Sequence, residues 1–581
     1  MNLSLLRSHR SRILVWVMLG VGAIFVVRLF YVQILQHGYY EAEALKEHVT
    51  KFSIPAKRGL IYAKDGEKNV VPLVLNEPAY TVYADPRYVE DVDKTAGTLR
   101  RIAGGNVVDG FEKALKDKEL QYTVLARQLN KQQADLLKKE QLSGVGLQAL
   151  DRRVYPEGQL ASQLLGYVNN EGDGQYGLEQ ALNETLIGKA GMLKTVTDVH
   201  GIPLSVSEND VQIPAQNGKS PVLTIDRNVQ AYVEQALKAG LEKAKADHGS
   251  AVVMDPHTGA VLAMANLPTY DPTKYYEVKD YSAFQNAVVS DPYEAGSAIK
   301  SLTMAAGLNE GVVTPNSTFL NTSSVQVEDA TIKNVLQVNG NRTMTEVLQH
   351  SLNTGVVYVL KQLGGGDLNR TARNKLFDYF SNHYFFGKKT GIEQSGEAGG
   401  VLISPDDPEG NNVRYANMSF GQGMDTTMIQ VASAFSSVVN GGSYFKPHLI
   451  DGYLKDDNTV EKQQPQILKP DVVRQSTATD LRGMLQVARA KTFPGVDKPG
   501  YGIGGKTGTS QIIDPKTGKY IDNNAIGTYV GFGGNSLPQY VIMIRVVDAK
   551  TSGYSGSVAA APIFADISNW MLDYLKIQPS R

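Results

Sequence analysis

The fold and the chemistry of this chain are decided by the stretch Tyr293-Glu294-Ala295-Gly296-Ser297-Ala298-Ile299-Lys300. From Ser297 onward the residues favour a helix that ends before Gly311, and serine is a favoured residue at a helix start. Residues three apart on a helix lie on one face, so the Ser297 hydroxyl and the Lys300 amine can meet. A desolvated lysine can take the proton of a serine, and free N–H groups at the helix N-terminus can stabilise an oxyanion. The stretch therefore predicts a serine nucleophile with Lys300 as its base.

A second Ser-x-x-Lys pattern, Ser443-Tyr444-Phe445-Lys446, does not meet the same condition. Pro447 follows it directly and disfavours the helical conformation for Lys446. Its serine and lysine are therefore not expected to share a helix face, and only the Ser297 copy is predicted to be chemically active.

The stretch Lys506-Thr507-Gly508-Thr509 lies in a glycine-rich segment that predicts an extended strand. On a strand, Lys506 and Gly508 share one face, whereas Thr507 and Thr509 share the other. The lysine and the threonine hydroxyls could hold a carboxylate, and Gly508 would let a peptide substrate approach the backbone. A second copy, Lys516-Thr517-Gly518, follows a proline and is predicted to be an exposed turn.

Between these two motifs lies Ser351-Leu352-Asn353. Ser-x-Asn by itself carries little weight, and Ser207-Glu208-Asn209 is a chance copy. Its weight comes from the order Ser-x-x-Lys, Ser-x-Asn, Lys-Thr-Gly, which is typical of penicillin-binding proteins and of class A β-lactamases.

Composition excludes several other classes of function. The length of 581 residues allows two to four domains, and the net charge of −1 gives no reason to expect nucleic acid. The chain has no cysteine, and its 9 histidines include no pair with HExxH-like spacing. We therefore predict no metal and no cofactor.

The N-terminal residues predict a membrane anchor. Residues 1–12 carry three arginines and no acid, and residues 13–35 form an apolar run, interrupted by Arg28, that is long enough to span a bilayer. A cleaved signal peptide is the alternative, but the run is too long and no small-x-small cleavage site follows it. The arginines place residues 1–12 in the cytoplasm and the bulk of the chain outside it.

The rest of the chain divides near residue 217, where the composition becomes that of a linker. Residues 36–215 are predicted to be a mixed α/β domain, with strands at 51–61 and 79–83 and exposed helices within 110–141. Residues 216–581 are predicted to hold two hairpins, at 250–264 and 527–546, and a final helix at 559–575. Strands at both ends with helices between them predict an antiparallel sheet covered by helices, an α+β fold.

These features together resemble the class B penicillin-binding proteins over almost the whole chain. Besides the three motifs, the resemblance rests on short signature segments, namely Arg58–Ile61, Arg153–Gly158, Gly177–Glu179, Ser419–Gly423 and Asn440–Gly442. It implies a transmembrane helix, a pedestal of the dimerisation type and a serine transpeptidase domain with a β-lactamase-like fold. It also implies a D,D-transpeptidase that cross-links peptidoglycan through an acyl-enzyme and that binds β-lactams.

The resemblance implies roles for the motif residues. Ser297 would attack the carbonyl of the penultimate D-alanine, with Lys300, kept neutral by burial, as its base. Ser351 would relay the proton toward the leaving D-alanine, and Asn353 would hold the substrate amide.

The strand would bind the other end of the substrate. By the same resemblance, Lys506, Thr507 and Thr509 would hold the terminal carboxylate, with Gly508 in the substrate-binding strand. The backbone N–H groups of Ser297 and Thr509 would form the oxyanion hole.

The chain departs from the family pattern at two places. The family has Pro-Gly before the nucleophile, where this chain has Ala295-Gly296, and this loosens the lead-in. It has Asp-Arg where this chain has Ala63-Lys64, which puts the usual ion-pair arrangement of the pedestal in doubt.

The expected location is the bacterial inner membrane, with a single span and an extracytoplasmic catalytic domain. The expected partners are stem peptides ending in D-Ala-D-Ala, β-lactam antibiotics, a membrane glycosyltransferase and other division or elongation proteins, with division favoured. Three alternatives are a β-lactam sensor, an inactive scaffold and a secreted β-lactamase. The intact motifs oppose the scaffold, the anchor and large pedestal oppose the sensor, and no motif for a deacylating base supports the β-lactamase.

Overall fold

The computed structural model describes residues 9–40, 49–66, 69–196, 211–513, 520–550 and 556–580. Contacts divide the chain into two compact units. One unit is residues 1–58 with 187–218, and the other is residues 59–186 with 219–581.

The smaller unit contains an apolar helix and a small sheet. Helix α1 (His9–Phe30) continues into a π-helical turn, η2 (Tyr31–Leu35). The span Ser11–Leu35 is long and apolar enough to cross a membrane, and none of its most apolar stretch is buried by other described residues. An apolar helix that packs against nothing is typical of a membrane span. The sheet has the strand order β1-β8-β9 and consists of β1 (Val49–Ile54), β8 (Gly191–Val196) and β9 (Val211–Ile213).

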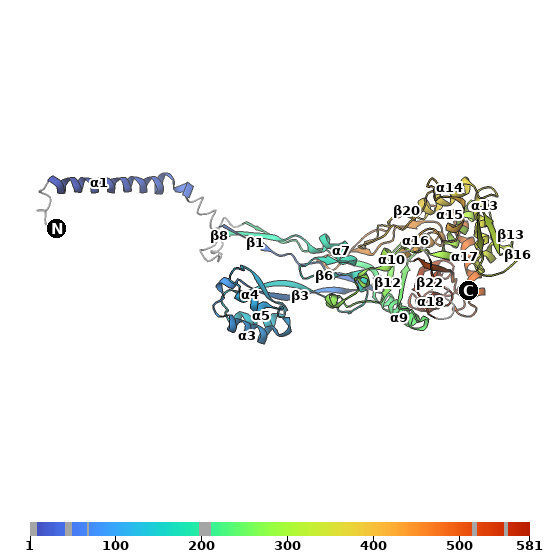
Figure 1. Ribbon diagram of the computed structural model, residues 1–581, viewed down its shortest axis with the longest axis horizontal. Coiled ribbons are helices and arrows are strands. Elements are labelled where there is room, and N and C mark those ends of the chain that lie inside the picture. Colours follow the sequence, from blue (N-terminus) through green and yellow to red (C-terminus); the bar gives the residue numbers. More distant parts are fainter. Residues whose placement is uncertain are drawn as a thin grey trace. The chain divides into compact units, whose positions relative to one another are not determined.

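The larger unit begins with a lobe built on the long strand β3 (Asn69–Ala84), which pairs with β2 (Ile61–Asp65), β4 (Thr123–Leu129) and β5 (Val145–Val154). Three helices lie together beside it, namely α3 (Val92–Ala103), α4 (Phe111–Lys116) and α5 (Lys131–Lys139) (Figure 1).

The prediction of helices across residues 110–141 is correct at α4 and α5 and wrong between them. Strand β4 lies there because Leu125, Ala126 and Leu129 are fully buried in the core of the lobe and the strand pairs with β3. The predicted strand at 51–61 is likewise two strands, β1 and β2, with Pro55 between them.

The sheet of this lobe continues past the expected domain boundary. Strand β10 (Ser220–Asp226) lies parallel to β2, and β18 (Ile450–Leu454) and β19 (Val460–Lys462) extend the sheet on the other side of β10. Two ion pairs belong to this region. Lys64 pairs with Asp451 at 2.9 Å, and Arg153 pairs with Glu179 at 2.6 Å in a fully buried position.

The second sheet is antiparallel, with the strand order β12-β11-β23-β22-β21. Its strands are β11 (His248–Met254), β12 (Val261–Leu267), β21 (Gly504–Ile513), β22 (Tyr520–Gly534) and β23 (Pro538–Val547). Both predicted hairpins are confirmed, since β11 pairs with β12 and β22 pairs with β23.

Helices cover both faces of this sheet, as predicted. Alternating side chains of β11, β12, β22 and β23 enter two separate cores, one of which includes α9 (Arg227–Ala244) and α18 (Ala560–Tyr574). The other core includes α11 (Lys300–Asn309) and α16 (Met428–Val439). Helix α17 (Gln475–Thr492) packs against edge strand β21.

Candidate active site

Ser297 lies in the first turn of its helix, which is a 3₁₀ turn, η7 (Gly296–Ile299), that continues directly into α11. Its side chain is half-buried. Gly296 has a φ of +57°, and a Cβ placed there would lie 2.5 Å from the carbonyl oxygen of Thr509. Only glycine therefore allows strand β21 to lie this close to the nucleophile.

Lys300 is the first residue of α11 and is almost completely buried. Its Nζ donates to the backbone oxygen of Ser351 at 2.5 Å and to Ser351 Oγ at 3.1 Å. Burial, and secondly the nearby charge of Lys506, hold the pKa of Lys300 well below its ordinary value. Among the described residues, no hydrogen bond joins Ser297 and Lys300, and the Lys300 amine is bonded to Ser351 instead.

Ser351 lies in the turn between α12 (Met344–Gln349) and α13 (Asn353–Leu363) and has a φ of +54°. Its hydroxyl accepts hydrogen bonds from two lysines, since Lys506 Nζ is 3.0 Å and Lys300 Nζ is 3.1 Å from Oγ. Asn353 Nδ2 donates to the carbonyl of Lys333 at 2.8 Å. The structure thus brings Ser351 to the centre of the site and places Asn353 at its margin.

Lys506 reaches the site from the edge strand β21. It is 3% exposed, and its Nζ also contacts the carbonyl and the hydroxyl of Thr507 at 3.0 and 3.1 Å. Burial lowers the pKa of Lys506 to about 7. The two motifs that are most distant in the sequence therefore converge on one hydroxyl, that of Ser351.

Burial alternates along the strand motif, as predicted. Lys506 and Gly508 are buried, Thr507 is half-buried and Thr509 is exposed. Thr509 Oγ1 accepts a hydrogen bond from the backbone of Gly556 at 3.1 Å.

The prediction that Gly508 leaves room for a substrate is corrected. A Cβ at Gly508 would lie 2.6 Å from the carbonyl oxygen of Ala295 and 3.4 Å from the nitrogen of Ala298. The space is filled by the protein's own lead-in to Ser297, so the glycine permits contact between strand and helix.

The rejected motif copies can be tested in part. Residues Tyr444–Phe445 form the short strand β17, so the Ser443 copy has no helical stacking, which confirms its exclusion. The copies at 207–209 and 516–518 lie outside the described residues.

The sequence analysis assigned no role to Ser419–Gly423, the segment that binds the residues directly before Ser297. Gly296 donates its backbone N–H to the carbonyl of Gly421 at 3.1 Å, and Glu294 Oε1 accepts from the backbone of Gly423 at 2.6 Å. Arg545 lies over the ring of Tyr293, 4.4 Å from its centroid. The glycine pattern of Ser419–Gly423 was visible in the sequence, but its partner was not.

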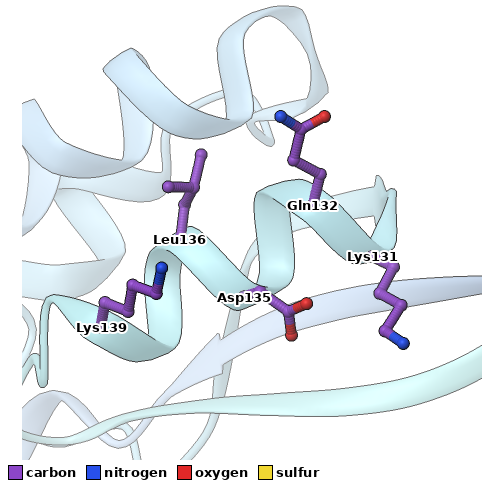
Figure 2. Close-up of a pocket in the computed structure, with 5 residues that line it drawn as sticks. All are labelled: Lys131, Gln132, Asp135, Leu136 and Lys139. Carbon is purple, nitrogen blue, oxygen red and sulfur yellow. The ribbon is translucent and has the colours of Figure 1, made fainter.

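The described residues contain no group of three or more histidine, aspartate or glutamate side chains that could hold a metal ion. A surface hollow of about 500 Å³ lies on helix α5 (Figure 2). It is lined by Lys131, Gln132, Asp135, Leu136 and Lys139, and it contains none of the motif residues.

Two family models match this chain. The penicillin binding protein transpeptidase domain matches residues 249–569, which is more than half of the chain, and the penicillin-binding protein dimerisation domain matches residues 53–223. The chain is 31% identical over 580 residues to stage V sporulation protein D of Bacillus subtilis, covering 98% of this chain and 87% of that protein.

The chain belongs to the class B penicillin-binding proteins.

This penicillin-binding protein is also 29% identical to peptidoglycan D,D-transpeptidase FtsI of Escherichia coli K12, over 98% of this chain and 93% of that protein. Its fold matches the crystal structure of penicillin binding protein 3 from Mycobacterium tuberculosis complexed with aztreonam, with a TM-score of 0.68 and 24% identity. That match covers 91% of this chain and 98% of the other, and at this identity it speaks for the fold alone.

Proposed function

We propose that Ser297 is the acylated serine of this D,D-transpeptidase. The observation that carries the proposal is the convergence of two buried lysines, Lys300 and Lys506, on Ser351 Oγ at 3.1 and 3.0 Å. A membrane-anchored penicillin-binding protein with a complete transpeptidase domain is a serine acyltransferase of peptidoglycan synthesis. The two lysines bring a base and a carboxylate-binding cation to the turn that holds Ser351.

In the acylation step, Ser297 Oγ forms a bond to the carbonyl carbon of the penultimate D-alanine of a stem peptide. Its proton passes to the neutral Lys300, which burial deprives of its charge. The bond to the terminal D-alanine breaks, and Ser351 passes the proton from Lys300 to the leaving amine. The amine of a second stem peptide then displaces Ser297 from the acyl-enzyme and cross-links the two peptides.

The strand and its partners hold the substrate during this step. Lys506, Thr507 and Thr509 bind the terminal carboxylate, and Gly508 keeps the strand close to the nucleophile. Asn353 holds the substrate amide. The backbone N–H groups of Ser297 and Thr509 stabilise the oxyanion, and the close approach of Gly296 to Thr509 supports this pairing.

Mass spectrometry of the full-length protein after reaction with a penicillin tests the nucleophile. We expect the adduct on Ser297, no labelling in Ser297→Ala, and normal labelling in the control Ser443→Ala. An adduct on the peptide that contains Ser443 would contradict the proposal.

The apolar span at the N-terminus also supports a proposal for the location of this protein. We propose that residues 13–35 span the inner membrane, with residues 1–12 in the cytoplasm and a pedestal (36–215) and transpeptidase domain (216–581) outside it. A reporter enzyme that is active only outside the cytoplasm should be active when it is fused to the C-terminus. An inactive fusion would contradict the proposed topology. The proposed partners are a membrane glycosyltransferase of the cell wall machinery and other division or elongation proteins.

A further inference from the structure

Helix α13, which begins two residues after Ser351, lacks a capping side chain of its own. Its N-cap residue is Leu352, whose side chain forms no capping hydrogen bond. A distant residue supplies the missing acceptor, since Asn334 Oδ1 accepts from the backbone N–H of Thr354 at 3.1 Å. Asn334 follows strand β15 (Ala330–Lys333) and is 5% exposed. Unsatisfied N–H groups at a buried helix start are unfavourable, so the start of α13 depends on Asn334.

Asn334 belongs to a closed ring of three buried polar side chains. Its Nδ2 donates to Asn321 Oδ1 and to Thr354 Oγ1, both at 3.0 Å, and Thr354 Oγ1 donates to Asn321 Oδ1 at 2.8 Å. The three side chains are 1–5% exposed. A buried polar network with all of its partners in place fixes one arrangement of the backbone around it.

The same segment also holds the catalytic motif on the other side of the helix start. Lys333, the neighbour of Asn334, accepts the hydrogen bond from Asn353 Nδ2 at 2.8 Å. Ser351 has a left-handed φ of +54°, a conformation that non-glycine residues rarely adopt and that persists only when the surroundings enforce it. The consecutive residues Lys333 and Asn334 thus bind the first two residues of α13.

We propose that Asn334 is a positioning residue that holds the Ser351-x-Asn353 turn in its reactive geometry. It touches neither the substrate nor the reacting atoms, and it acts through the N-terminus of α13. The proposal rests on the proposed function, because it assumes that Ser351 and Asn353 serve the acylation of Ser297.

The test compares acylation rates of full-length protein with a fluorescent penicillin. Asn334→Leu has a similar shape and removes the cap, so we expect a loss on the order of 10- to 100-fold, as misplaced catalytic groups produce. The control is Asn369→Leu, which removes the cap of α14 (Arg370–Asp378), a helix that carries no motif, and its rate should equal that of the wild type.

A double-mutant cycle separates positioning from general destabilisation. If Asn334 acts through the turn, the combined loss in Asn334→Leu/Asn353→Ala is smaller than the product of the two single losses. Losses that multiply, or an Asn334→Leu rate equal to the wild-type rate, would overturn the proposal. If the wild type itself is not acylated at Ser297, the proposed function fails instead.

A second pair of variants tests the proposal if the Asn334→Leu protein does not fold well enough to be purified. Thr354→Ser keeps the hydroxyl of the ring and Thr354→Val removes it with little change in shape. We expect Thr354→Val to be acylated several-fold more slowly than Thr354→Ser, and equal rates would overturn the proposal.

Discussion

At the scale of single residues, the site is defined by two buried lysines that share one hydroxyl. Neither Lys300 nor Lys506 forms an ion pair with a carboxylate among the described residues, so burial is not offset for either amine. This lowers the pKa of both, and it favours a neutral Lys300 as the base. In the proposed function, the carboxylate that restores the charge of Lys506 belongs to the substrate.

Lys300→Arg tests the assignment of the base. A guanidinium keeps the positive charge but does not give up its proton, so we expect acylation by a penicillin to fall by a factor on the order of 100 or more. Stopped-flow or gel-based measurement of the acylation rate decides it, with Lys389→Arg, an exposed lysine, as the control. A rate near that of the wild type would remove Lys300 from the base role.

The pH dependence of acylation tests the charge of Lys506. Its pKa of about 7 means that the amine is charged below that pH and neutral above it. Carboxylate binding by the free enzyme should therefore weaken as the pH rises through about 7, whereas on the acid side the rate falls once Lys300 becomes protonated.

Two comparisons isolate the alkaline limb of this profile. Lys506→Arg stays charged at high pH, so its limb should move to higher pH even if its maximal rate is lower. A substrate whose carboxylate is esterified should also lack the limb. An unchanged limb in both cases would assign it to another group.

At the scale of elements, the site depends on how closely strand β21 fits against the first turn η7. The strand lies against the backbone of the lead-in at two glycines, Gly296 and Gly508, where added Cβ atoms would lie 2.5 and 2.6 Å from carbonyl oxygens. From this strand, Lys506 Nζ donates to Ser351 Oγ at 3.0 Å.

Gly296→Ala should disrupt this fit. The φ of +57° strains any residue with a Cβ, by roughly 1–2 kcal/mol, and the contact with Thr509 forces the strand to move. We expect acylation to fall at least about tenfold, together with a lower melting temperature. The control is Gly483→Ala in α17, where nothing lies within 4 Å of the added Cβ, and its acylation should be unchanged. Equal behaviour of the two variants would contradict the fit.

At the scale of the whole molecule, the larger unit contains a buried ion pair formed by two of the signature segments. Arg153 and Glu179 have side chains that are 4% and 0% exposed, and Arg153 Nη1 also donates to Asn76 at 2.6 Å. At the departure Ala63-Lys64, Ala63 is buried and Lys64 pairs with Asp451.

Arg153→Ala and its neighbour Arg152→Ala form a matched test. Arg153→Ala breaks the buried ion pair with Glu179, which costs about 3–5 kcal/mol, whereas exposed pairs such as that of Arg152 with Glu77 contribute about 1 kcal/mol or less. We expect a clearly lower thermal unfolding midpoint for Arg153→Ala and almost no change for Arg152→Ala. Similar midpoints for the two variants would show that the buried pair does not stabilise this unit.

What the sequence by itself determined were the local and compositional features. The order of the three motifs, the two hairpins, the last helix and the apolar span follow from side-chain periodicity, turn residues and run length, which act between near neighbours. Pro447 was likewise enough to exclude the Ser443 copy, because proline restricts the residue directly before it.

Only the tertiary structure decided the features that join distant segments. The sequence placed Ser297 beside Lys300, but the fold puts Ser351 Oγ between the amines of Lys300 and Lys506. Strand β4 replaced a predicted helix because pairing with β3 and burial outweighed its local pattern. The partners of Arg153 and Thr354 lie 26 and 20 residues away in the chain, and no local rule selects them. Such contacts are chosen by the packing of the whole fold, because each buried polar group must find a partner within it.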